Sequence, residues 1–295
     1  MRMSLANPIE PRTDAVMKSY LLTPRSDSAI KLNVRERGEG PLAILLHGIT
    51  ANAAVWDPIA EYLGQRLNVL AIDQRGHGRS HKPMSGYTAE DFSYDVKCIV
   101  EEVGRGKAVL IGHSLGARNA VFTAALYPKL FSAVVAIDFT PFIEKEVFEI
   151  IEKRLRAGDK SFQSLEEVED YLRQRYQKTP IDAIKRRAQF GFEETVSGWR
   201  PLAYPAAIIE THKAIANRNV EEAYRSLPLP LMLIRGAEST VVSAQAFEKT
   251  RRLRPDAEAI VFDNTDHYVH EEEPQLVGAK ILEFLTRNNV LSQAH

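Results

Sequence analysis

The pentapeptide Gly112-His113-Ser114-Leu115-Gly116 decides the fold, because it stands between a short apolar run and a helical pattern. The run Ala108–Ile111 predicts a buried strand, and the pattern Leu115–Tyr127 predicts a helix. A serine on such a tight turn takes a strained backbone conformation, and the flanking glycines remove side chains that would clash there. The turn would hold the Ser114 hydroxyl above the end of a sheet and aim the main-chain N–H of Leu115 at an oxyanion beside it. For the pentapeptide alone, the alternative is a chance match in a helix-capping loop.

Short apolar runs and helical patterns alternate on both sides of this turn. Further strands are predicted at Ser19–Leu22, Ala29–Val34, Leu42–Leu46, Asn68–Ile72, Ala133–Ile137, Leu229–Ile234 and Ala259–Phe262, and further helices at Asp57–Gly64, Ala89–Val103 and Glu273–Thr286. The first two strands are expected to form a hairpin. Alternating strands and helices predict an α/β fold with a mostly parallel sheet of about eight strands flanked by helices. In such a sheet, ligands bind at the carboxyl ends of the strands.

The alternation of strands and helices stops between residues 141 and 225. This stretch is rich in charge, has no convincing strand, and shows helical patterns at Ile143–Ala157, Leu165–Gln177 and Ile181–Phe190. We therefore predict a helical cap at residues 141–225, inserted into a core formed by residues 18–140 and 226–295. Residues 1–17 are expected to be a loose N-terminal extension.

The amino-acid composition excludes several classes of function. The 295 residues are 44% hydrophobic and 26% charged, as in an ordinary globular protein, and the net charge of −1 gives no field to attract nucleic acid or a membrane. No apolar run approaches the roughly 18 residues of a membrane span, and the N-terminus lacks the apolar region of a secretory signal. The single cysteine, Cys98, excludes an intrachain disulfide and fits a cytoplasmic location. The oligomeric state cannot be read from the sequence, so a homodimer stays open.

Three further motifs follow predicted strands. They are Leu45-Leu46-His47-Gly48, the stretch Asp73-Gln74-Arg75-Gly76-His77-Gly78-Arg79-Ser80, and Asp266-His267. Together with the pentapeptide, and in this order along the chain, they make the sequence resemble the α/β-hydrolase family. The resemblance runs from about Ser19 to the C-terminus, except in the cap.

The resemblance implies a catalytic serine and histidine. Ser114 would be the nucleophile and His267 its general base, which a serine hydroxyl needs because it is barely ionised near neutral pH. The main-chain N–H groups of Ile49 and Leu115 would form the oxyanion hole. The other histidines are expected to be structural in motif turns (His47, His77 and His113) or exposed at the surface (His81, His212, His270 and His295).

The acid that would orient His267 departs from the family pattern. Many relatives carry G-x-x-D after the strand that is predicted to end at Ile234, whereas this chain has Gly236-Ala237-Glu238-Ser239. Asp138, at the end of the strand after the nucleophile helix, is the favoured acid, because some relatives use that position and a carboxylate need only reach the imidazole. Glu238 is the alternative. Asp266 is a weaker candidate for the acid, because the side chains of adjacent residues in an extended loop, here Asp266 and His267, tend to point apart. Asp138 could instead be a helix N-cap.

Ser114 also separates this chain from two branches of the family. Haloalkane dehalogenases and epoxide hydrolases carry aspartate at the nucleophile position. No histidine and carboxylate spacing suggests a metal site, and no second glycine-rich turn suggests a dinucleotide. We therefore expect no metal and no cofactor.

Two arginines in the predicted cap indicate the class of substrate. Arg154 lies on the apolar face of the helix Ile143–Ala157, and Arg175 continues the apolar face of the helix Leu165–Gln177. Arginines at such positions are costly to bury without anionic partners. They reach the rim, pair with cap glutamates, or bind the carboxylates of a small substrate.

The displaced acid and the cap arginines together resemble a branch of the family that acts in bacterial vitamin B6 degradation. This resemblance implies cofactor-independent hydrolysis of the amide C–N bond of an enamide dicarboxylate, giving acetate, ammonia, carbon dioxide and succinate semialdehyde. The alternatives are a C–C bond hydrolase of ring-cleavage products, a carboxylesterase, or a small-molecule sensor of the same fold.

Overall fold

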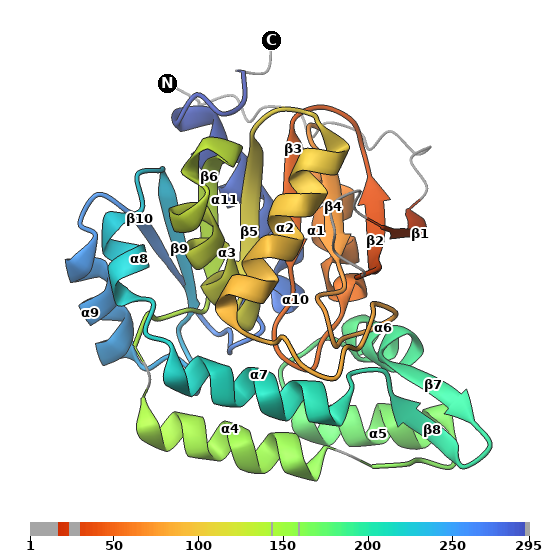
Figure 1. The fold of residues 1–295 in the computed structure, drawn as a ribbon. Helices are drawn as coiled ribbons and strands as arrows, with labels where there is room; N and C mark the ends of the chain where they lie inside the picture. Colours follow the sequence, from red (N-terminus) through yellow and green to blue (C-terminus); the bar gives the residue numbers. More distant parts are fainter. Residues whose placement is uncertain (1–16, 24–29, 143, 159, 293–295) are drawn as a thin grey trace, which may run out of the picture.

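The computed structural model describes residues 17–23, 30–142, 144–158 and 160–292, and it leaves the side chains of Arg154 and Ala157 undescribed. An eight-stranded sheet forms its centre, in the order β1-β2-β4-β3-β5-β6-β9-β10 (Figure 1). The strands are β1 Lys18–Leu22, β2 Leu32–Arg37, β3 Leu42–Leu46, β4 Asn68–Ile72, β5 Ala108–His113, β6 Phe131–Ile137, β9 Leu231–Gly236 and β10 Glu258–Phe262. Strands β1 and β2 form the predicted hairpin, and from β4 to β10 all neighbours are parallel. The prediction of a mostly parallel sheet of about eight strands is confirmed.

Helices cover both faces of this sheet. In Figure 1, α2 (Ala89–Val103) and α3 (Leu115–Leu126) pass in front of it, while α1 (Asp57–Leu63) and α11 (Pro274–Arg287) lie behind it. The remaining core helices are the short α8 (Glu221–Ser226), α9 (Ala244–Leu253) and α10 (Val269–Glu272), with two 3₁₀ turns at Ala53–Trp56 and Pro128–Leu130. The layers therefore follow the order helix, sheet, helix, as βαβ units require.

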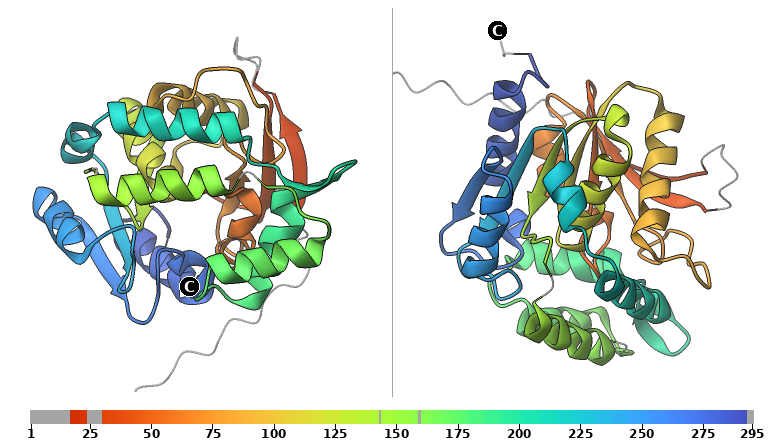
Figure 2. Two further views of the ribbon diagram at one scale, coloured as in Figure 1. Left: turned by 90° about the horizontal axis from the view of Figure 1, so that it is seen from below. Right: turned by 60° about the vertical axis from the view of Figure 1, so that its left-hand side comes forward.

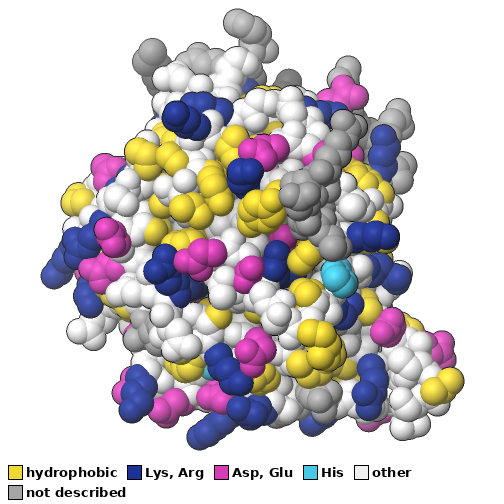
Figure 3. All heavy atoms as spheres, in the orientation of Figure 1, with side chains coloured by type: hydrophobic (Ala, Val, Ile, Leu, Met, Phe, Trp, Pro, Cys, Tyr) yellow, Lys and Arg dark blue, Asp and Glu magenta, His cyan; other side chains and the backbone are white. Residues whose placement is uncertain are grey.

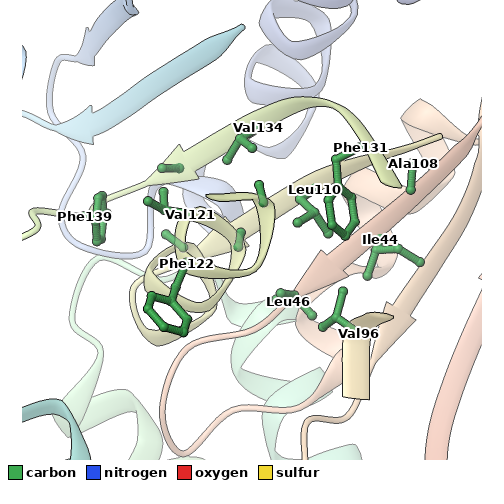
Figure 4. Close-up of a cluster of buried hydrophobic side chains, with 14 of the residues drawn as sticks. Ile44, Leu46, Val96, Ala108, Leu110, Val121, Phe122, Phe131, Val134 and Phe139 are labelled. Carbon is green, nitrogen blue, oxygen red and sulfur yellow. The ribbon is translucent and has the colours of Figure 1, made fainter. Parts of the chain in front are cut away.

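Side chains of the central strands alternate between two apolar clusters. From β3, Ile44 and Leu46 point toward α2 and α3, where they pack with Leu110 and Val121 (Figure 4). Leu45, between them, belongs to the cluster on the other face with α1 and α11. Strands buried on both faces need apolar residues at every position. This requirement explains why the continuous runs of β3 and β4 predicted the bounds of both strands.

The segment between β6 and α8, which we call the cap, lies across the carboxyl ends of the strands (Figures 1 and 2). It contains α4 (Lys145–Ala157), α5 (Leu165–Arg175), α6 (Ile181–Gly191) and α7 (Pro205–Asn217). The expectation that it has no strand is wrong, because β7 (Phe192–Thr195) and β8 (Gly198–Pro201) pair as an antiparallel hairpin. Its strands have few apolar residues, and main-chain bonds between Phe162 and Trp199 extend the pairing. Strands that are held by pairing with a distant segment need no alternation of apolar and polar residues, so the sequence does not reveal them.

The surface is mixed in character. On the face shown in Figure 3, side chains of both charges lie side by side and apolar groups occur between them. Across the described ranges, no helix is at once long enough and apolar enough to pass through a membrane.

Candidate active site

Ser114 forms the sharp turn between β5 and α3. Its backbone has φ 53° and ψ −113°, a region that residues other than glycine rarely enter. The two glycines of the pentapeptide are required by close packing. A Cβ atom on Gly112 would lie 2.2 Å from the carbonyl oxygen of Gly116, and one on Gly116 would lie 2.0 Å from the carbonyl oxygen of Leu46. The serine is therefore held where the predicted turn placed it, at the carboxyl edge of the sheet.

Asp138 and His267 meet at the same edge of the sheet. Asp138 directly follows β6, His267 lies in the loop after β10, and both side chains are buried. The Nδ1 atom of His267 lies 2.5 Å from Oδ2 of Asp138. A carboxylate at Nδ1 holds the proton on that nitrogen and leaves Nε2 free to accept one. His267 and Ser114 line the same cavity, which has a volume of about 440 Å³.

The other two candidate acids do not contact the His267 ring. The Glu238 side chain is half exposed and pairs with Lys178. The Asp266 carboxylate accepts a hydrogen bond from the main chain of Thr240 (3.4 Å). Asp138 does not act as an N-cap, since the next helix in the described chain, α4, begins only at Lys145. Asp138 is thus the carboxylate that the structure brings to His267.

Ser239, which replaces the usual family aspartate, also contacts Asp138. Its hydroxyl donates to Oδ2 of Asp138 (2.6 Å) and accepts main-chain N–H bonds from Val241 (3.3 Å) and Val242 (3.1 Å). The main-chain N–H of Gly236 approaches the other carboxylate oxygen (3.3 Å). These donors stabilise the negative charge of a fully buried carboxylate.

The turn that carries Ile49 is fixed by His47. The main-chain N–H of Gln74 donates to Nε2 of His47 (3.0 Å), and Nδ1 of His47 donates to the carbonyl of Gly48 (2.8 Å). Burial lowers the pKa of His47 to about 4, so the ring is neutral near pH 7 and suits this pattern of donor and acceptor. Ile49 and Leu115, the two predicted oxyanion-hole residues, both line a cavity beside Ser114.

His113, next to the serine, supports the loop of His267. Its Nε2 donates to the main-chain carbonyl of His267 (2.9 Å), and its ring packs against those of His267 and His270, with centroids 4.5 Å and 4.1 Å away. Burial lowers the pKa of His113 and of His270 well below the ordinary value. His113 and His270 are therefore neutral near pH 7 and add no charge beneath the site.

Two histidines predicted at the surface are buried, so those predictions are wrong. His270 packs between Trp56 and His113, and His212 stacks on Phe148 with ring centroids 3.7 Å apart. Their polar sequence neighbours gave no sign of the aromatic partners, which come from distant segments. His81 is exposed as predicted, whereas His295 lies outside the described residues.

Of the two cap arginines, only Arg175 has a described side chain. It is half-buried at the end of α5, lines the larger cavity together with Ser114 and His267, and donates to the hydroxyl of Tyr171 (3.1 Å). Arg154 lies on α4, but its side chain is outside the described part of the structure, so its predicted role stays a prediction.

Three residues of this region, Tyr176, Arg187 and Glu271, carry no signal in the sequence. Tyr176 is buried in the cavity wall, with the guanidinium of Arg187 4.5 Å from its ring centroid. Burial opposes ionisation of Tyr176, but the positive charges of Arg187 and Arg175 outweigh it and lower its pKa. Arg187 forms a buried ion pair with Glu271, which joins α6 of the cap to α10 of the core. No local pattern could reveal a pair whose members lie 84 positions apart.

Residues 41–274 match the family model of the α/β hydrolase fold, and the chain belongs to this family. It is a hydrolase, as the four motifs predicted. The chain is 44% identical over 271 residues to 2-(acetamidomethylene)succinate hydrolase of Mesorhizobium japonicum, with 92% of this chain and 97% of the relative covered.

Solved structures agree with this assignment. The crystal structure of E-2-(acetamidomethylene)succinate hydrolase superposes with a TM-score of 0.88 at 44% identity, covering 92% of this chain and 99% of that one. A thioesterase domain from the curacin biosynthetic pathway superposes with a TM-score of 0.77 at 20% identity, covering 90% and 99% of the two chains. This second likeness shows the fold alone. Within the described ranges, no group of three or more His, Cys, Asp or Glu side chains is arranged to hold a metal ion.

Proposed function

We propose that this protein hydrolyses the amide bond of (E)-2-(acetamidomethylene)succinate. Two observations together carry the chemistry: His267 contacts Asp138, and His267 and Ser114 line the same cavity. The substrate is proposed from the 44% identity to the Mesorhizobium enzyme over nearly the whole chain. No cofactor takes part in the proposed reaction.

In the proposed mechanism, Ser114 Oγ attacks the amide carbonyl while Nε2 of His267 takes its proton. The main-chain N–H groups of Ile49 and Leu115 stabilise the oxyanion. His267 then gives the proton to the leaving nitrogen, the C–N bond breaks, and an acetyl-serine remains. Water, activated by the same histidine, releases acetate. The aminomethylene succinate that leaves takes up a second water, loses ammonia and then carbon dioxide, and ends as succinate semialdehyde.

Charge complementarity supports a dicarboxylate substrate. Arg175 lines the same cavity as Ser114 and His267, and its guanidinium carbon lies 5.7 Å from the ring centroid of Tyr176, which also lines the cavity. A guanidinium in a partly buried wall binds a carboxylate through charge-assisted hydrogen bonds. We assign Arg175 to one substrate carboxylate and Arg154, from its position on α4, to the other.

Product analysis tests the proposal directly. The purified protein should release acetate and succinate semialdehyde in equal amounts from (E)-2-(acetamidomethylene)succinate, and Ser114→Ala should lower kcat by several orders of magnitude with an unchanged Tm. Ring-cleavage dienoates and simple carboxylesters, assayed in parallel, distinguish the other activities. Faster turnover of a dienoate by C–C cleavage, or an active Ser114→Ala variant, would contradict the proposal.

A further inference from the structure

Two cavities meet at Ser114. The larger one, of about 440 Å³, is lined by His267, Arg175 and Tyr176. The smaller one, of about 120 Å³, is lined by Ser114 together with residues of α4 and α7 of the cap. Its apolar wall consists of aromatic and aliphatic side chains, among them Phe139, Phe142, Val147, Phe148, Ile215 and Val242. His267 is absent from the described lining of the smaller cavity.

The charged groups in the wall of the smaller cavity are bound to other parts of the protein. Arg118 donates from Nη2 to the main-chain carbonyls of Ile215 and Arg218. Glu144 accepts a hydrogen bond from the hydroxyl of Ser243 (2.7 Å). The carboxylate of Asp138 is engaged by His267 and Ser239. The smaller cavity therefore suits an uncharged, apolar group.

The position of His267 decides which part of the substrate each cavity receives. The histidine must give a proton to the leaving atom, so the leaving group has to lie on the side of Ser114 where His267 is, in the larger cavity. The acyl group, on the other side of the scissile bond, then points toward the smaller cavity. This assignment rests on the proposed roles of Ser114 and His267.

We propose that the smaller cavity is the acyl pocket and that the enzyme also hydrolyses substrates with unbranched acyl chains longer than acetyl, up to butyryl. A cavity of about 150 Å³ lined by apolar side chains can hold a benzene molecule. At about 120 Å³, the smaller cavity has room for more than the methyl group of acetate. Each added methylene that leaves water raises binding by about fourfold, as long as the pocket holds it.

An acyl series on one leaving group tests this inference. With p-nitrophenyl acetate, propionate, butyrate and octanoate, kcat/KM should rise about fourfold for each methylene up to butyrate. Val147→Phe, which fills the smaller cavity from α4, should abolish the rise from acetate to butyrate. Ile150→Phe is the matched control, since Ile150 is exposed on the same helix and lines neither cavity. Ile215→Phe fills the pocket from α7 if Val147→Phe folds poorly.

The outcomes separate this inference from the proposed function. A kcat/KM that falls from acetate to butyrate in the parent, or equal effects of Val147→Phe and Ile150→Phe, would overturn the acyl-pocket assignment alone. Ester hydrolysis that persists in Ser114→Ala would overturn the proposed catalytic roles instead. A preference for butyrate without turnover of (E)-2-(acetamidomethylene)succinate would leave the acyl pocket standing and remove the proposed substrate.

Discussion

Ser239 and His267 share one oxygen of Asp138: Oδ2 accepts from the serine hydroxyl at 2.6 Å and contacts Nδ1 of the histidine at 2.5 Å. Ser239 stands where many members of the family carry the acid, after β9, while Asp138 follows the neighbouring strand β6. Two adjacent strand ends thus approach the same point beside the imidazole. Asp138, the proposed acid, therefore lies one strand away from the usual family position, and the serine hydroxyl at that position donates to it.

Replacing the acid should have a large and specific effect. Asp138→Asn should lower kcat on the order of 10⁴-fold, because the amide no longer holds His267 in the required tautomer. Glu238→Gln is the matched control and should change kcat little, since Glu238 pairs with Lys178 at the surface. Steady-state kinetics of the two variants check this ranking. The reverse ranking would move the acid to the loop after β9.

Restoring the usual acid should recover activity. In Asp138→Asn/Ser239→Asp, a carboxylate returns at the strand end next to the imidazole, so kcat should exceed that of Asp138→Asn by about tenfold or more. Asp138→Asn/Ser239→Ala serves as the control, and it should recover nothing. Equal rates for the two double variants would show that position 239 cannot orient His267 in this fold.

The cap arginines should recognise charge. A charge-assisted hydrogen bond is worth about 1.5–3 kcal/mol, so Arg175→Met should lower kcat/KM for a dicarboxylate by about 10-fold to 100-fold. We expect the same of Arg154→Met from its sequence position. Hydrolysis of a neutral ester should stay near the parent rate. If dicarboxylate and neutral ester lose rate equally, the arginines organise the cap and do not bind carboxylates.

The buried ion pair between α6 and α10 should be costly to break. Glu271→Ala leaves the Arg187 guanidinium buried without its partner, and the free energy of unfolding should fall by about 3–5 kcal/mol. Replacing both members, in Arg187→Met/Glu271→Leu, should restore most of this loss. Glu283→Ala, which removes an exposed pair with Lys280, should cost less than about 1 kcal/mol. Urea unfolding of the three variants tests this order, which an equal loss in all three would refute.

Stability should depend on pH through the buried histidines. Burial lowers the pKa of His47 to about 4 and of His77 to about 3, whereas an unfolded histidine titrates near about 6.5. Between these values only the unfolded chain binds the proton. The unfolding free energy should therefore have its highest value above about pH 6.5 and decrease as the pH falls below it. The decrease should reach up to about 1.4 kcal/mol per pH unit for each histidine.

Urea unfolding at several pH values between 7.5 and 5 measures this slope. His270→Phe removes one buried neutral histidine and should lower the slope by about one proton, because burial also lowers the pKa of His270. His81→Gln, at an exposed position, should leave the slope unchanged. A parent slope near zero would show that these histidines bind protons equally in both states.

The parts of the molecule that were predictable from sequence are those with a local physical cause. Strands β3 and β4 are buried on both faces, so their apolar runs mark their bounds, and the turn at Ser114 needs glycines on both sides. The contact of Asp138 with His267 was predicted from the resemblance to the family, because some relatives carry the acid at the end of that strand and the base in the loop after the last strand.

The remaining features depend on contacts between distant segments. The hairpin β7–β8 pairs through Trp199 with Phe162, and His212 is covered by Phe148 from another helix. From sequence alone, a polar side chain is expected at the surface. It is stable in the interior only when it has bonding partners there, and these come from distant parts of the chain. For the same reason Tyr176 beside Arg175 gave no signal.

The left-handed backbone of three residues around Ser114 has a consequence for the evolution of this enzyme. Thr50, Ser114 and Asp138 all have positive φ (68°, 53° and 48°), a conformation that costs residues other than glycine about 1–2 kcal/mol each. Glycine would remove that cost at any of them. Selection for thermal tolerance alone would thus favour glycine at position 114, the position of the proposed nucleophile. The serine side chain persists there only while selection acts on turnover, so stability and activity oppose each other at this turn.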